Sequence, residues 1–156
     1  MRPARPVAGV SAWIAAALLV ALTGCSSADS DSDADAGSAA LQPASTACAQ
    51  DAHAKPLPAG FPADFPLPGG TIVTTADDRG SGGLVIEGVT PSAFKTVLHD
   101  LQTALPAKGF TPDHGETEPH DAESDWSSAS YTGRWAIREL DRCGGQTAVS
   151  VVARKK

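Results

Sequence analysis

The composition of the first 47 residues indicates that a folded domain lies in the rest of the chain. Residues 7–22 form an apolar run that only Gly9 and Ser11 interrupt, and Arg2 and Arg5 precede it without any acidic residue. Residues 26–47 then consist mostly of Ser, Asp, Ala and Gly. Such a segment buries too little apolar surface to offset the entropy lost on ordering. Residues 48–156 are therefore the stretch in which we expect a single domain with its own hydrophobic core.

The apolar run has the form of an export signal. A cationic segment, an apolar core and small residues before a cleavage site are typical of a secretory signal peptide. The run is also shorter than the roughly 20 residues that a membrane-spanning helix needs. An ordinary signal peptide with a chance cysteine after it, and an uncleaved anchor, are the two alternatives to the interpretation that follows.

The run ends in Leu22, Thr23, Gly24 and Cys25. These residues resemble the lipobox of bacterial lipoproteins, which consists of an apolar residue, a small residue, Gly or Ala, and Cys. The resemblance implies that residues 1–24 are a lipoprotein signal peptide and that Cys25 is the acylated first residue of the mature chain. It also implies a lipid-anchored protein on the outer, extracytoplasmic face of the plasma membrane.

Residues 25–47 are then the lipidated cysteine and a disordered acidic tether. Asp29, Asp31, Asp33 and Asp35 alternate with small residues, but Ala36 stands where a calcium loop requires Gly. The formal net charge of the whole chain is −6, and loss of Arg2 and Arg5 with the signal makes it more negative. Nucleic acid, whose phosphates select Lys and Arg, is therefore not expected as a partner.

The two remaining cysteines, Cys48 and Cys143, lie 95 positions apart near the two ends of the expected domain. With Cys25 lipidated, two cysteines in an exported protein are expected to form a disulfide. A pair of free buried thiols is the alternative. The sequence thus predicts one domain over residues 48–156 that a disulfide closes.

A helix is the clearest element of this domain. Thr90 is a good N-cap residue, and Pro91 suits the first helical position. Apolar residues then repeat at helical spacing and form one face, namely Phe94, Val97, Leu98, Leu101 and Leu105. Pro106 and the following Lys108 and Gly109 end the pattern.

Strand-like segments flank this helix on both sides. They are residues 71–75 and 84–89 before it, and residues 126–131, 135–140 and 147–153 after it. Residues 55–70 are rich in Pro and indicate an extended arm, and residues 141–146 indicate a turn. This order predicts an α+β fold in which one amphipathic helix packs on one face of an antiparallel sheet.

A polar segment after the helix contains the candidate metal ligands. His114, Glu116, Glu118 and His120 share parity, and two imidazoles with two carboxylates on one strand face suit a borderline metal ion. Pro112, Gly115 and Pro119 interrupt a regular strand, however, and further acidic residues continue the segment, namely Asp113, Asp121, Glu123 and Asp125. We therefore expect a mobile, solvated loop over residues 113–125 and no metal site.

Three aromatic residues follow this segment. Trp126, Tyr131 and Trp135 either pack within the sheet or form a stacking platform for a sugar or aromatic ligand. No nucleophile elbow, phosphate loop or zinc motif occurs in the sequence. We therefore expect no catalytic residue and no cofactor, and we do not expect an enzyme.

Two short segments relate the expected domain to known proteins. Residues 65–70, Phe-Pro-Leu-Pro-Gly-Gly, precede a strand, and Val89, Thr90, Pro91 and Ser92 open the helix. In these segments the domain resembles the small uncharacterised lipoproteins of actinobacteria, a resemblance that implies no particular activity. The expected function is a binding or accessory module that acts on an unknown envelope protein or ligand. The alternative is a metal- or small-ligand-binding lipoprotein that uses residues 114–125 or the three aromatic residues.

Overall fold

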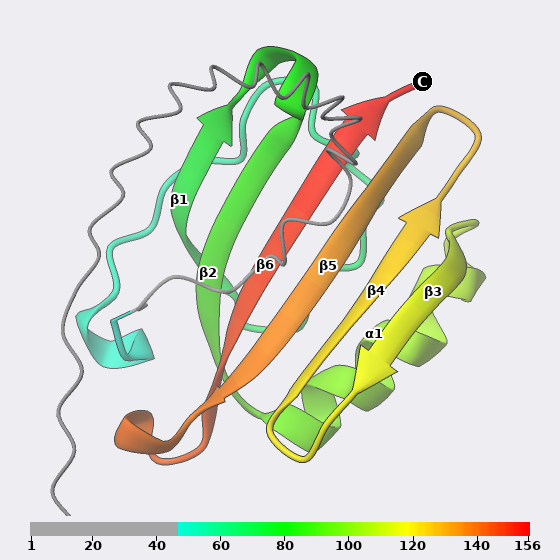
Figure 1. Cartoon of the computed structure of the whole chain (residues 1–156). Helices are drawn as coiled ribbons and strands as arrows, with labels where there is room; N and C mark the ends of the chain where they lie inside the picture. The colour runs from blue at the N-terminus through cyan, green and yellow to red at the C-terminus, as the bar shows by residue number, and fades with distance from the viewer. Residues whose placement is uncertain (1–46) are drawn as a thin grey trace, which may run out of the picture. The chain divides into compact units, whose positions relative to one another are not determined.

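Residues 47–156 are described by a computed structural model, in which six strands form one antiparallel sheet (Figure 1). The strands are β1 (Ile72–Asp78), β2 (Leu84–Ala93), β3 (Thr111–Thr117), β4 (Asp121–Ser127), β5 (Tyr131–Leu140) and β6 (Gln146–Lys155), and α1 (Phe94–Ala107) follows β2. Their order across the sheet is β1-β2-β6-β5-β4-β3. The predicted α+β fold is thereby confirmed. The expected signal peptide, Cys25 and all but the last residue of the expected tether lie outside the described residues.

The last strand, β6, lies between β2 and β5 in the sheet (Figure 1). It pairs with β2 from Gln146 to Ala153 and with β5 from Gln146 to Lys155. Seven consecutive residues of β6, 147–153, are buried. A nearly continuous run of small and apolar residues is what a strand needs when both of its faces are covered.

The helix α1 packs on one face of the sheet (Figure 1). Its buried residues are Phe94, Val97, Leu101 and Leu105, which are four of the five that the helical spacing places on the apolar face. From the sheet they meet the buried side chains of Ile86, Trp135, Ile137, Val149 and Val151. Each such side chain contributes about 1.5–3 kcal/mol relative to an exposed position, so this interface stabilises the domain substantially.

The helix begins later than the sequence predicts, and the expected N-cap at Thr90 is wrong. Thr90 and Pro91 belong to β2, and Ala93 is the N-cap residue of α1. Thr90 is completely buried, and its hydroxyl donates a hydrogen bond to the carbonyl oxygen of Gly69 at 2.8 Å. Continued pairing of β2 with β6 therefore prevails over the local preference of Thr90 for a helix start.

A hairpin occupies the place of the expected loop. β3 and β4 pair across residues 111–127, and the register shifts between Pro112 and Gly115. A β-bulge at a sheet edge accommodates both residues, because Pro cannot donate to a ladder and a Cβ at Gly115 would lie 2.5 Å from the carbonyl oxygen of Glu123. The expected loop is therefore wrong. All seven residues of β3 are exposed to solvent, whereas the residues of β4 alternate between half-buried and buried.

The Pro-rich arm passes from the edge of the sheet into the core. The backbone N–H of Lys55 donates to the carbonyl oxygen of Val73 on β1 at 2.7 Å. Further along the arm, the ring of Phe65 lies 5.4 Å from that of Phe110 and 5.1 Å from that of Trp126. The arm thus supplies aromatic side chains to the same core as α1.

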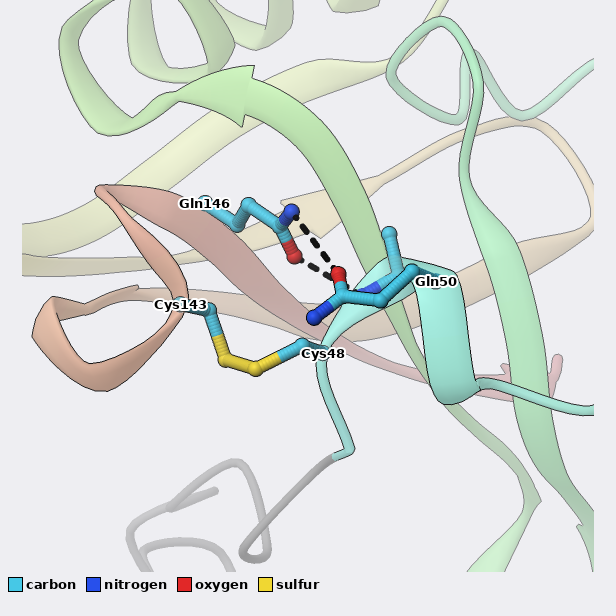
Figure 2. The surroundings of a disulfide bond; sticks show 5 residues. Cys48, Gln50, Cys143 and Gln146 are labelled. Atoms are coloured by element: carbon cyan, nitrogen blue, oxygen red, sulfur yellow. Dashed lines mark hydrogen bonds between the residues drawn. A yellow bond between two sulfur atoms is a disulfide. The ribbon is translucent and has the colours of Figure 1, made fainter.

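The predicted disulfide between Cys48 and Cys143 is confirmed, with Cα atoms 5.4 Å apart (Figure 2). It joins the start of the described chain to η3 (Asp141–Cys143), the turn that precedes β6. The side-chain oxygen of Gln146 on β6 also accepts a hydrogen bond from the backbone N–H of Ala49 at 2.8 Å. The beginning of the domain is therefore fixed to the beginning of its central strand.

Reduction of this disulfide is expected to lower the free energy of unfolding by about 4–5 kcal/mol, because the bond closes a loop of 95 residues in the unfolded chain. Urea unfolding with and without reductant measures the difference. The double substitution of Cys48→Ser and Cys143→Ser is the control and should respond to urea identically in both conditions. Equal midpoints for the unsubstituted protein with and without reductant would contradict the expectation.

Candidate functional site

His120 is the member of the predicted metal set that the structure places in a group of three possible ligands. It lies in the turn between β3 and β4, which a hydrogen bond from the N–H of Glu118 to the carbonyl oxygen of Asp121 closes at 2.7 Å. The N–H of Glu139 donates to the carbonyl oxygen of His120 at 2.8 Å, which extends the β4–β5 ladder by one step. Backbone pairing therefore places these two residues side by side.

The side chains of His120 and Glu139 are joined as well. Nδ1 of His120 lies 2.6 Å from Oε2 of Glu139. Asp141, two residues after Glu139, adds a carboxylate, and one ligand atom from each of the three residues lies within 4.8 Å of the other two. His120 and Asp141 are exposed and Glu139 is half-buried, so solvent reaches the cluster. We call these three residues the His120 cluster.

The carboxylates of the cluster favour the protonated imidazole. The hydrogen bond that the imidazole donates to Glu139 raises the pKa of His120 above its ordinary value of 6.5. Desolvation opposes this rise, and the negative charges of Glu139, Asp141 and Asp121 add to it. Because the folded state holds this proton more tightly than the unfolded state, the pair stabilises the fold at low pH. That contribution disappears as the pH rises through the pKa of the folded protein.

A cavity of about 430 Å³ adjoins the His120 cluster. It is lined by Ala93, Phe94, Lys95, Pro119, His120 and Glu139. Ala93 and Phe94 are the N-cap and the first residue of α1, and no side chain caps the backbone N–H groups there. Imidazole, carboxylate and ammonium groups therefore belong to the residues that line one opening.

The other predicted metal ligands lie apart from this cluster. His114 is exposed on β3, with Nδ1 2.8 Å from the carboxylate of Asp113. Glu116 pairs with Glu123 across the hairpin, and Glu118 lies in the turn. Glu139 and Asp141 were missed by sequence reasoning. The sequence signal for them is weak, because it consists only of two acidic residues two positions apart at the end of a strand. The strand register, which the sequence does not show, is what places them near His120.

The aromatic residues proposed as a stacking platform are mostly core residues. Trp126 and Trp135 are 2% and 3% exposed and belong to the core under α1. Tyr131 is half-buried, and its hydroxyl donates to the carbonyl oxygen of Gly60 at 2.8 Å. The two tryptophans therefore pack within the sheet and do not offer an open face to a ligand.

Tyr131 does line a second cavity, of about 570 Å³, near the C-terminal end of α1. Its lining includes Phe61 and Asp64 of the arm, Lys108 and Phe110 after the helix, and Ser130 in the turn between β4 and β5. Aromatic and charged side chains thus meet at this opening too. The two cavities lie against residues at opposite ends of α1.

No family model, curated protein or solved structure matches this chain. Within residues 47–156, no helix is long and apolar enough to cross a membrane.

Substitution Glu139→Gln is expected to lower the pKa of His120, because the largest cause of its rise is the hydrogen bond to that carboxylate. NMR titration of the imidazole in the folded and the urea-unfolded protein measures the effect. In the unsubstituted protein His120 should titrate at higher pH when folded than when unfolded. Glu116→Gln, a carboxylate on β3 outside the cluster, serves as control and should leave the titration unchanged. Identical titration of His120 in both states would refute the predicted effect.

Proposed function

We propose that the chain is the precursor of a membrane-anchored lipoprotein whose domain acts outside the cytoplasm as a binding or accessory module. The observation that carries the proposal is the order of features at residues 2–25. Two arginines precede an apolar run, and the run ends in Leu22, Thr23, Gly24 and Cys25. Charge, apolar core and lipobox each have the place that export and lipid transfer require.

The cysteines of the domain support this assignment. The sequence contains three cysteines, and the bond between Cys48 and Cys143 accounts for two of them. Disulfides form and persist in oxidising compartments and are rare in the cytosol. Cys25 is then the cysteine left with a thiol, which as thiolate is the nucleophile that accepts the lipid.

The proposed lipid would attach the domain to the membrane. Each buried CH₂ contributes about 0.8 kcal/mol, so the two acyl chains of a diacylglycerol hold a protein stably at a membrane. Residues 26–47 separate this anchor from the domain in the sequence and consist mostly of Ser, Asp, Ala and Gly. The anchored domain would then meet an envelope protein or ligand at the membrane surface.

Two features of the domain favour a role in binding. The cavities near the two ends of α1 each combine apolar walls with charged groups, Lys95 beside His120 in one and Asp64 with Lys108 in the other. Ligand sites in proteins have this character, with apolar walls and a few polar groups that fix orientation. The partner is therefore proposed to be an envelope protein or small ligand that one of these openings holds.

The substitution Cys25→Ala is expected to abolish processing, because no thiol remains to accept the lipid and cleavage follows lipid transfer. Expression in a bacterial host that processes lipoproteins, followed by immunoblotting of membrane fractions, should show a larger precursor for the variant and a smaller mature form for the unsubstituted chain. Ser26→Ala, next to the lipobox, is the matched control and should be processed normally. A mature form of unchanged size in the Cys25→Ala variant would disprove the assignment.

A further inference from the structure

We propose that His120, Glu139 and Asp141 bind one divalent transition-metal ion. This inference does not depend on the lipid anchor, because it rests on the described domain alone. It departs from the sequence-based expectation of no metal site. Two of its three ligands also lie outside residues 113–125, at the end of β5 and in the following turn.

The spacing of the ligand atoms suits a metal ion after small side-chain movements. Metal–ligand bonds of about 2.0–2.2 Å place the ligands of a tetrahedral ion roughly 3.4 Å apart. The three ligand atoms lie within 4.8 Å of one another, and those of His120 and Glu139 are already in contact at 2.6 Å. His120 and Asp141 are exposed, so their side chains can turn toward a common centre without disturbing the core.

The backbone holds all three residues near one another before any ion arrives. The hydrogen bond between the N–H of Glu139 and the carbonyl oxygen of His120 joins the two strands at this point. Asp141 opens the turn η3, in which its carbonyl oxygen accepts from the N–H of Gly144 at 3.2 Å and which the disulfide at Cys143 fixes. The chain therefore loses little conformational entropy when the ion binds, and such preorganisation favours binding.

The charges at the cluster match a divalent cation. With a neutral imidazole, Glu139 and Asp141 carry two negative charges, which one divalent ion neutralises. Asp121 adds a third negative charge nearby, which its ion pair with Arg138 at 3.6 Å offsets, and Lys95 of α1 lines the adjoining cavity. The imidazole nitrogen that binds the ion must be free of its proton, so binding weakens as the pH falls.

The chemistry of the three ligand atoms indicates which class of metal ion suits the site. One imidazole nitrogen with two carboxylate oxygens suits Zn²⁺ or Cu²⁺, whereas Ca²⁺ and Mg²⁺ prefer oxygen ligands alone. Three protein ligands leave a coordination position for water or an added ligand. The cavity of about 430 Å³ beside His120 and Glu139 has room for such a group.

Isothermal titration of the full chain with Zn²⁺ near neutral pH tests the proposal. The protein carries Cys25→Ala, so that no free thiol binds the metal, has no histidine tag, and is kept in detergent. One Zn²⁺ per chain is expected, and excess Mg²⁺ should not displace it. His120→Ala and Asp141→Asn should each weaken binding by roughly ten-fold or more, and Asp141→Asn does so with the contact between His120 and Glu139 intact.

His114→Ala is the matched control, because His114 also lies beside a carboxylate but belongs to no group of three possible ligands among residues 47–156. It should bind Zn²⁺ as the unsubstituted chain does. In NMR spectra, the signals of His120, Glu139 and Asp141 should shift first as the metal is added, which also shows that the variants remain folded. Absence of binding, equal affinity in the His120→Ala variant, or an equal loss in the His114→Ala variant would overturn the proposal.

Discussion

The pairing of β6 with both β2 and β5 is the interaction on which the rest of the domain depends. The hairpin of β1 and β2 and the meander of β3, β4 and β5 each pair strands that are neighbours in sequence. The core beneath α1 contains side chains from both parts, Ile86 of β2 and Trp126 of β4 among them. β6 joins them, and its ladder with β2 spans about sixty residues of chain, so a large loop must close before the core forms. The disulfide immediately before β6 fixes the entry to this strand and reduces the freedom of the unfolded chain.

The same framework positions the His120 cluster. The ladder of β4 with β5 places Asp121 opposite Arg138, and the next step brings His120 to Glu139. Asp141 then lies where β5 passes into the disulfide-bonded turn. The end of the sheet that the disulfide fixes therefore carries an exposed group of ionisable side chains near the N-terminus of α1. Metal capture and ligand binding by the adjoining cavity would both use this end of the domain.

Local patterns in the sequence predict much of this fold. The helical spacing of Phe94, Val97, Leu101 and Leu105 identifies the buried face of α1, and the cysteine count identifies the disulfide. Features that depend on strand register are not accessible in this way. The residues around Thr90 predict a helix N-cap there, but its pairing with β6 keeps it in β2.

Strand register also determines which residues become neighbours at the candidate site and around the aromatic residues. Glu139 and Asp141 follow His120 by 19 and 21 positions, and no local rule relates residues at that distance. Gly133 lies opposite Trp126 on the neighbouring strand, where a Cβ would come within 2.4 Å of the indole ring. The glycine makes room for that indole against the sheet, and the tryptophan is a core residue for that reason. The sequence alone does not show that Gly133 lies opposite Trp126, so it leaves both sheet packing and a ligand platform open.

The chemical state of Cys25 decides whether this domain is a surface-tethered module. Mass spectrometry of the N-terminal peptide, prepared from the protein isolated from bacterial membranes, measures that state directly. The lipoprotein proposal predicts a peptide that begins at Cys25 and carries a diacylglycerol on its sulfur. A free thiol at Cys25, or a mature N-terminus at another residue, would contradict it.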